Sequence, residues 1–199
     1  MEFFVQSYED LLKSISAALE GLDRGEVETL LESLIDTRAR GKKVLVVGAG
    51  RSGLVGKAFA MRLMHLGFQV YVLGETINPN VGEGDLVIVI SGSGKTTVPL
   101  AAAQMAESLN AKVVAITSQE ESPLAHAADL VVDMPGREDI AAENEYHIRQ
   151  LKGQHESLAP MGTMFEDTTM IFLDSIIAEL MNRLGLSEDA MRERHATIE

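Results

Sequence analysis

The sequence contains no cysteine and no tryptophan, and only 5% of its residues are aromatic. Without cysteine the chain can form no disulfide and can use no thiol as a nucleophile, and its redox compartment stays undetermined. No apolar run reaches the roughly 18 residues that a membrane-spanning helix needs. The N-terminus, "MEFFVQSYED", lacks the basic start and apolar core of a signal peptide. We therefore expect a cytoplasmic protein without a membrane partner.

Positive charge is also scarce, because 17 Lys and Arg residues stand against 30 Asp and Glu residues and give a formal net charge of −13. This balance argues against nucleic acid as a partner, since nucleic-acid binding requires a basic face. An anionic small molecule would need a locally positive pocket, which Arg51 and Lys95 are placed to supply. The length of 199 residues and the hydrophobic content of 46% suit one domain over 1–199.

Short apolar segments alternate with amphipathic ones along most of the chain. They predict strands at 42–47, 69–73, 85–90, 111–117 and 129–134, with helices at 51–66, 96–109, 122–127 and 163–184. Such short, continuously apolar strands fit a parallel sheet covered on both faces, in an α/β domain. One or two amphipathic helices are expected over 7–37, broken near 21–25, and a short charged helix precedes the tail. The polar stretch 135–162 is too long for an ordinary connection and is expected to be a lid or an intersubunit contact.

The turn after the third predicted strand reads "VISGSGKTT" (89–97) and looks at first like an ATP-binding P-loop. A P-loop needs a glycine five positions before Gly94, where this chain has Val89, so the turn is too short for two successive phosphates. One phosphate fits, because a glycine turn leads into a helix whose first N–H groups and dipole favour an anion. The candidate phosphate-binding residues are Ser91, Gly92, Ser93, Gly94, Lys95 and Thr96. The alternative is a helix start that Ser or Thr merely caps.

A second glycine-rich loop, "GAGRSG" (48–53), follows the first strand. With Glu75 at the end of the second strand it forms a dinucleotide-binding fingerprint, so NAD binding is an alternative. In a flavodoxin-like sheet of order 2-1-3-4-5 the first and third strands are neighbours, and both loops open onto one crevice. Arg51 and Ser52 would then face the hydroxyls of the second turn across a phosphate-sized space.

These loops, together with "AMRLMHLG" (60–67), "PMGTMFED" (160–167) and "RHATIE" (194–199), resemble the SIS (sugar isomerase) domain and, within it, the 6-phospho-3-hexuloisomerases. The resemblance runs from about residue 30 to the end. It implies an enzyme that interconverts 3-hexulose 6-phosphate and fructose 6-phosphate, in formaldehyde fixation by the ribulose monophosphate pathway or in pentose supply. It also implies a homotetramer that uses no metal and no cofactor. Two departures are small: Lys95 occupies a variable position, and the tail lacks an Asn-Leu pair before its last Glu.

The same resemblance assigns the phosphate to Ser52 and the turn 91–96, and the catalytic base to Glu166. Moving a carbonyl from C3 to C2 needs a base that takes a proton from C2 and returns one to C3 through a 2,3-enediol. From the residues alone, Glu166 also fits a capping box with Thr163 as the N-cap. Against capping alone, Glu166 shares a helical stripe with Met170 and Leu173 that should face the core or a crevice. Asp167 is the adjacent alternative base.

His195 lies in the charged tail and by itself would be solvated surface. By analogy with other SIS isomerases it could enter a neighbouring subunit's site and move protons between O2 and O3, since a 3-hexulose 6-phosphate has no five-membered ring to open. His147 and His155 lack metal-ligand spacing, so no metal site is expected. We expect the core at about 34–180, with the helices of 7–37 and the tail 186–199 as oligomer contacts. A non-catalytic sugar-phosphate sensor and another SIS isomerase remain alternatives.

Overall fold

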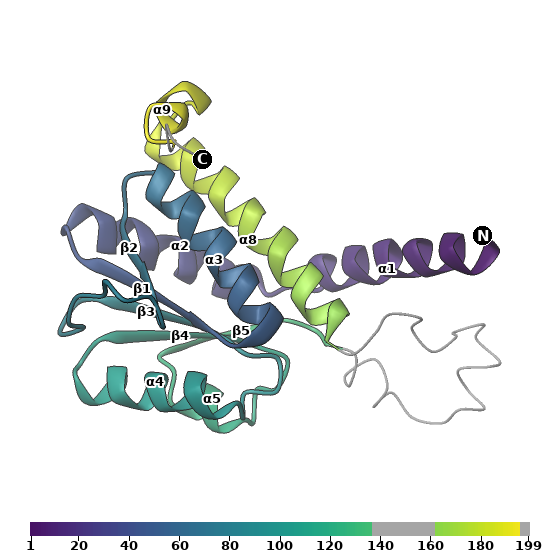
Figure 1. Cartoon of the computed structure of the whole chain (residues 1–199), viewed down its shortest axis with the longest axis horizontal. Coiled ribbons are helices and arrows are strands. Elements are labelled where there is room, and N and C mark those ends of the chain that lie inside the picture. Colours follow the sequence, from purple (N-terminus) through teal and green to yellow (C-terminus); the bar gives the residue numbers. More distant parts are fainter. Residues whose placement is uncertain (137–161, 196–199) are drawn as a thin grey trace.

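The computed structural model describes residues 1–136 and 162–195 (Figure 1). The helices are α1 (Glu2–Glu20), α2 (Arg24–Ala39), α3 (Gly50–His65), α4 (Thr97–Ser108), α5 (Pro123–His126), α8 (Thr163–Leu184) and α9 (Glu188–Arg192). The strands are β1 (Lys43–Gly48), β2 (Gln69–Val72), β3 (Leu86–Ile90), β4 (Lys112–Thr117) and β5 (Leu130–Asp133). Most of the polar stretch 135–162 lies outside the described residues, as do the last four residues of the tail. Within the described ranges, no helix is long and apolar enough to cross a membrane.

The five strands form one parallel sheet of order β2-β1-β3-β4-β5, which confirms the predicted flavodoxin-like architecture. The central strand β3 is buried at all five positions, as its unbroken apolar sequence predicts. Helices α4 and α5 cover one face of the sheet, and α2, α3 and α8 cover the other (Figure 1). Because every strand is parallel, all the carboxyl ends lie at one edge of the sheet.

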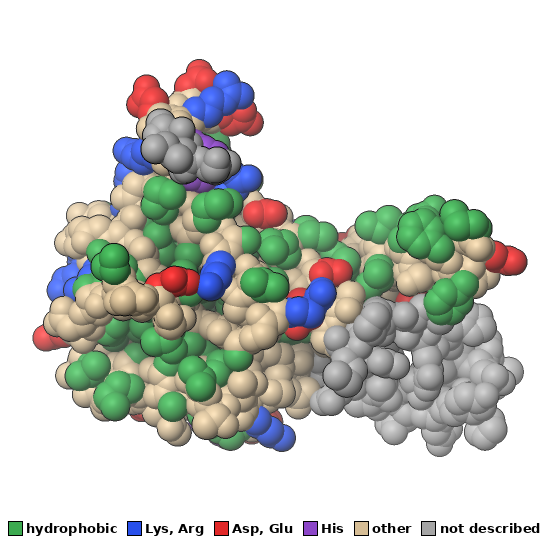
Figure 2. Space-filling view, in the orientation of Figure 1, with side chains coloured by type: hydrophobic (Ala, Val, Ile, Leu, Met, Phe, Trp, Pro, Cys, Tyr) green, Lys and Arg blue, Asp and Glu red, His purple; other side chains and the backbone are tan. Residues whose placement is uncertain are grey.

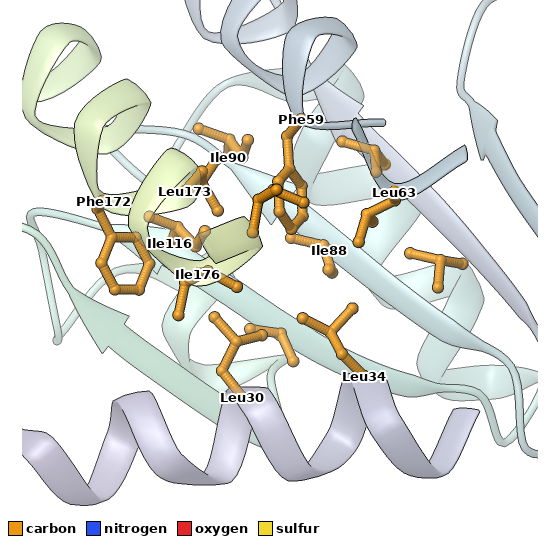
Figure 3. Packing of buried hydrophobic residues seen from close by; sticks show 14 of the residues in the cluster. Leu30, Leu34, Phe59, Leu63, Ile88, Ile90, Ile116, Phe172, Leu173 and Ile176 are labelled. Carbon is orange, nitrogen blue, oxygen red and sulfur yellow. The ribbon is translucent and has the colours of Figure 1, made fainter. Parts of the chain in front are cut away.

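The larger core lies between the sheet and the helices α2, α3 and α8 (Figure 3). Leu30 and Leu34 of α2 approach from one side, whereas Phe59 of α3 and Phe172 of α8 approach from the other. All four side chains are at most 3% exposed. This packing fixes α3 and α8 against each other, so that the first turns of both helices meet at the carboxyl edge of the sheet.

The N-terminal segment forms two helices that separate where its glycines predicted a break. Asp23 caps α2 by accepting hydrogen bonds from the N–H groups of Gly25 (2.6 Å) and Glu26 (3.2 Å). Helix α1 packs on α8 through Ile15, near Met164, and its N-terminal half then projects from the molecule (Figure 1). Figure 2 shows hydrophobic side chains gathered on this projecting half, where Phe3 is 65% and Phe4 62% exposed.

Asp85 joins the amino ends of β1 and β3. One carboxylate oxygen accepts the N–H of Lys43 (3.0 Å), and the other accepts the N–H of Gly82 (3.0 Å) and pairs with the Lys43 ammonium (3.1 Å). Desolvation raises the pKa of Asp85, but these hydrogen bonds and the charge of Lys43 together outweigh it and lower the pKa. The carboxylate therefore stabilises the register of the two strands that carry the glycine-rich loops.

Candidate active site

The glycine-rich loops after β1 and β3 begin side by side, because Gly48 and Ile90 are register partners in the sheet. From β1 the chain continues toward β2, and from β3 it continues toward β4 on the other side. The two connections therefore diverge at the carboxyl edge, which is the edge where ligands bind in sheets of this kind. The structure thus brings together the two loops that the sequence analysis selected.

The loop after β1 is a tight strand-to-helix turn that only glycine permits. A Cβ on Gly48 would come within 2.8 Å of the Ser52 carbonyl oxygen, and a Cβ on Gly53 within 2.9 Å of the Gly48 carbonyl oxygen. Gly50 has a left-handed backbone with φ of +57° and begins α3. Ser52 is buried, whereas the Arg51 side chain is 56% exposed and extends from the first turn of α3.

The turn after β3 holds its hydroxyls in place without using Thr96 as a cap. The Ser91 hydroxyl lies 3.3 Å from that of Thr96, and the Ser93 hydroxyl accepts a hydrogen bond from the Lys95 N–H (3.3 Å). Helix α4 begins at Thr97, and Thr96 makes no side-chain cap hydrogen bond. Ser93, Lys95 and Thr96 are exposed, whereas Ser91 is buried. Capping therefore does not account for the run of hydroxyls in this turn.

Glu166 stands in the first turn of α8 and meets Arg51 from the first turn of α3. Its side chain is 13% exposed, and its Oε2 accepts a hydrogen bond from Arg51 Nε at 2.5 Å. A second nitrogen, Arg51 Nη2, donates to Asp167 Oδ1 at 3.2 Å, and the Asp167 side chain is 43% exposed. One guanidinium thus bridges both candidate carboxylates, of which Glu166 is the more buried.

The capping-box prediction for this helix is wrong. Gly162, with φ of +72°, is the N-cap of α8, and no side chain of the described residues caps the helix. Thr163 is already helical, and Glu166 lies one position too far along to reach back to the cap. A Cβ on Gly162 would meet the Glu166 carboxylate at 3.2 Å, so the glycine leaves room for that side chain. The Glu166 carboxylate is therefore engaged with Arg51 and has no capping role.

Phe165 connects the two halves of the candidate site. Its ring lies against Gly92 so closely that a Cβ on Gly92 would come within 3.1 Å of a ring carbon. The residue next to Glu166 therefore contacts the turn 91–96 directly. The hydrogen bond from Arg51 to Glu166, followed by the negative charges of Glu166 and Asp167, raises the pKa of Arg51.

His195 lies at the opposite end of α3 from Arg51. Its ring stacks on that of His65 with centroids 5.1 Å apart, and the Arg194 Nη1 donates to the His65 carbonyl oxygen at 3.3 Å. Arg51 and His65 stand at the two ends of a 16-residue helix, which at 1.5 Å per residue separates them by roughly 20 Å. A hollow of about 460 Å³ lies at this far end, lined in part by Arg62 and Asp174. Within one chain, therefore, His195 does not join the site around Glu166.

The residues that suggested NAD binding or a metal site show no arrangement that favours either function in the described ranges. Glu75, the candidate ribose ligand of an NAD site, pairs with Lys57 of α3 at 2.7 Å. In the described ranges, no three His, Asp or Glu side chains gather as a metal site would require. His147 and His155 lie outside the described residues. The hydroxyls of Thr117 and Ser118, which the sequence analysis missed, contact the phosphate-sized turn from the end of β4. The pattern Ile-Thr-Ser after an apolar strand was the signal available for them.

Comparison with known proteins identifies a family match and several full-length relatives of this chain. A family model described as "SIS domain" matches residues 39–148, which include both glycine-rich loops but neither Glu166 nor His195. The 3-hexulose-6-phosphate isomerase of Bacillus subtilis is 36% identical over 190 residues, 96% of each chain. That of Methylomonas aminofaciens is 38% identical over 196 residues, 98% of this chain and 100% of the relative.

Solved structures agree with the sequence relatives. A crystal structure of a Methanococcus jannaschii protein, described as inferring a function of 3-hexulose-6-phosphate isomerase, matches with a TM-score of 0.75 and 34% identity, covering 100% of both chains. A ligand complex of an Escherichia coli protein matches with a TM-score of 0.76 at 20% identity, over 98% of this chain and 96% of that one, and supports the fold alone. Two glycine-rich loops at one sheet edge and these full-length matches lead to the same conclusion: the chain belongs to the SIS domain family.

Proposed function

We propose that this protein is a sugar-phosphate isomerase that interconverts 3-hexulose 6-phosphate and fructose 6-phosphate. The names of its relatives support isomerisation as the reaction class and 3-hexulose 6-phosphate as a substrate. The observation that carries the proposal is the contact between Gly92 and Phe165 together with the pair Arg51–Glu166. Through these contacts the turn 91–96 lies beside a nearly buried carboxylate. The proposed reaction needs an anion site for the phosphate and a base for the proton transfers.

The phosphate end of the substrate belongs in the turn 91–96. Its glycines bring backbone N–H groups close to a ligand, and the start of α4 favours negative charge. The exposed hydroxyls of Ser93 and Thr96 can donate to phosphate oxygens, and Ser52 lies on the neighbouring loop. Arg51 and Lys95 offset the acidic charge of the chain near this point.

Glu166 is the proposed base. In this mechanism its carboxylate takes the proton from C2 of the 3-hexulose, and the electrons of the C–H bond move to form the C2–C3 double bond while O3 gains negative charge. Protonation at O3 and loss of the proton from O2 complete the exchange of the carbonyl, as the same carboxylate returns a proton to C3. A single carboxylate beside the C2–C3 bond is enough for both carbon transfers, and no metal takes part.

Arg51 links the two ends of the substrate site. In the free protein its guanidinium is held by Glu166 and Asp167. A bound phosphate competes for the same guanidinium, because phosphate accepts paired hydrogen bonds from arginine as well as a carboxylate does. Transfer of Arg51 to the phosphate frees the Glu166 oxygen to accept a proton from carbon. A sugar without phosphate leaves the ion pair in place, so this exchange favours phosphorylated substrates.

His195 enters the proposal only through a second copy of the chain. Its distance from Arg51 within one chain excludes a direct role there. In a homotetramer, the tail of a neighbouring subunit could bring His195 to O2 and O3 of the enediol. The uncovered apolar side chains on the projecting half of α1 are consistent with assembly.

The deciding experiment measures fructose 6-phosphate formation from 3-hexulose 6-phosphate with a coupled assay. The expected result is turnover that continues after treatment with a chelator. Binding of fructose 6-phosphate without turnover would instead support a sugar-phosphate sensor. A change in nicotinamide fluorescence when NADH is titrated with the protein would support the dinucleotide-binding alternative.

A further inference from the structure

The carbonyl of Gly92, in the middle of the phosphate-sized turn, accepts three hydrogen bonds from the end of β4. The donors are the Thr117 hydroxyl (3.1 Å), the Ser118 hydroxyl (2.9 Å) and the Ser118 N–H (3.1 Å). One backbone donor would satisfy this carbonyl and continue the pairing between β3 and β4. The two hydroxyls therefore add a constraint that sheet pairing does not require.

These bonds determine the direction of the next N–H group. In a trans peptide the carbonyl and the following N–H point in opposite directions. Strand β4 lies on one side of β3, and β1 lies on the other. Because the Gly92 carbonyl points toward β4, the Ser93 N–H points toward the β1 side, where Arg51 and Ser52 stand. Within the described ranges, this N–H donates to no protein acceptor.

The rest of the turn is held from the same direction. The Gly94 carbonyl accepts the N–H of Leu124 (3.1 Å), and Gly94 packs against the Ser122 side chain so tightly that a Cβ there would overlap it. Ser91 donates its N–H to the Ile116 carbonyl (3.0 Å). Backbone contacts fix both ends of the turn, and at the Gly92–Ser93 peptide the two hydroxyls add to the single backbone hydrogen bond from Ser118.

We propose that Thr117 and Ser118 are positioning residues, which hold the Gly92 carbonyl so that the Ser93 N–H is aimed at the substrate's phosphate. The inference rests on the proposed function, since it assumes that the turn binds phosphate. Neither residue touches the phosphate. Both act through one peptide group, so their loss weakens phosphate binding and leaves the proton transfers at C2 and C3 almost unchanged.

The test compares Thr117→Val, Ser118→Ala and the double variant with the parent. Inorganic phosphate is the probe, and its dissociation constant is measured by calorimetry and as a competitive inhibition constant. Loss of one aimed N–H donor to an anion weakens binding roughly tenfold, so the double variant should bind phosphate about tenfold more weakly and show a similar rise in KM. Its kcat at saturating substrate should fall by less than about threefold. Thr117→Ser and Ser118→Thr keep the hydroxyls and should restore phosphate binding.

Thr37→Val is the matched control. It removes a buried hydroxyl that donates to the Ser33 carbonyl at 2.7 Å, far from the turn, so it reports the cost of losing such a bond to stability alone. If the double variant loses stability like Thr37→Val but binds phosphate like the parent, Thr117 and Ser118 are purely structural and the proposal is wrong. The proposal is equally wrong if kcat falls while phosphate binding is unchanged. If the parent itself does not bind phosphate, the phosphate turn of the proposed function fails as well. Should Thr117→Val fail to fold, Ser118→Ala and Ser118→Thr make the same comparison.

Discussion

Replacing Glu166 by glutamine separates its proposed chemistry from its structural contacts. Glutamine has the same shape, and its amide oxygen can still accept the hydrogen bond that Arg51 Nε now donates at 2.5 Å. The start of α8 depends on Gly162 and on backbone bonds, not on this side chain. We therefore expect the melting temperature of Glu166→Gln to shift by no more than about 4 °C.

The rate should change far more than the stability. An amide cannot take a proton from carbon, and loss of a general base typically lowers the rate by 10²–10⁴-fold. Substrate binding should change much less, because the turn 91–96 is untouched. The assay measures kcat and KM for fructose 6-phosphate formation, beside a thermal melt of the same preparation.

A labelled substrate tests the single-carboxylate mechanism directly. With deuterium at C2 of 3-hexulose 6-phosphate, part of the label should reappear at C3 of the product, diluted by exchange with solvent. Asp167→Asn is the control, since Asp167 shares Arg51 with Glu166 but is more exposed. Parental turnover in Glu166→Gln together with a large loss in Asp167→Asn would show that Asp167, and not Glu166, is the base. If neither substitution affects turnover, the base lies elsewhere.

Three further predictions concern the turn, the assembly and the sheet. Ser91→Ala, Ser93→Ala and Thr96→Ala should each weaken substrate binding about tenfold, measured as KM and as phosphate inhibition; parental values in all three would leave the turn without a ligand role. Analytical ultracentrifugation at micromolar concentration should show a homotetramer, and a monomer would remove the argument that His195 acts across an interface. Because the pKa of Asp85 is lowered in the folded state, its stabilising effect is present above the unfolded pKa of about 3.9 and is lost as the pH falls through the folded pKa. Thermal melts of Asp85→Asn should therefore depend less steeply on pH in acid than those of the parent.

The sheet was predictable from local patterns because each strand is a short apolar run that must be buried on both faces. Strand β3, buried along its whole length, lies within one residue of the predicted 85–90. The strand order was taken from flavodoxin-like sheets, in which the first and third strands are neighbours, and the structure confirms it. Helix starts were less predictable: the capping box over Thr163 was wrong because Gly162, with a left-handed backbone, is the N-cap and makes no side-chain cap hydrogen bond.

The contacts within the candidate site could not be derived from local sequence, because they join segments far apart in the chain. Arg51 and Glu166 are 115 positions apart, and nothing near either residue reveals the other. Their hydrogen bond depends on the packing of α3 against α8, whose buried apolar side chains belong to one shared core. The hydroxyls of Thr117 and Ser118 were missed for the same reason, since their acceptor is the backbone carbonyl of Gly92, which lies 25 and 26 positions away in the chain.

The pairing of Arg51 with Glu166 also changes how the glycine-rich loop should be understood. From sequence, "GAGRSG" was divided between a dinucleotide fingerprint and a phosphate loop, and the glycines alone satisfy both. In the structure Gly48 and Gly53 are required by the tight turn itself, so they carry no information about the ligand. The informative residue is Arg51, because its guanidinium reaches a nearly buried carboxylate on another helix. A carboxylate so close to the pyrophosphate of a dinucleotide would repel it, whereas the proposed isomerase reaction uses this carboxylate as its base.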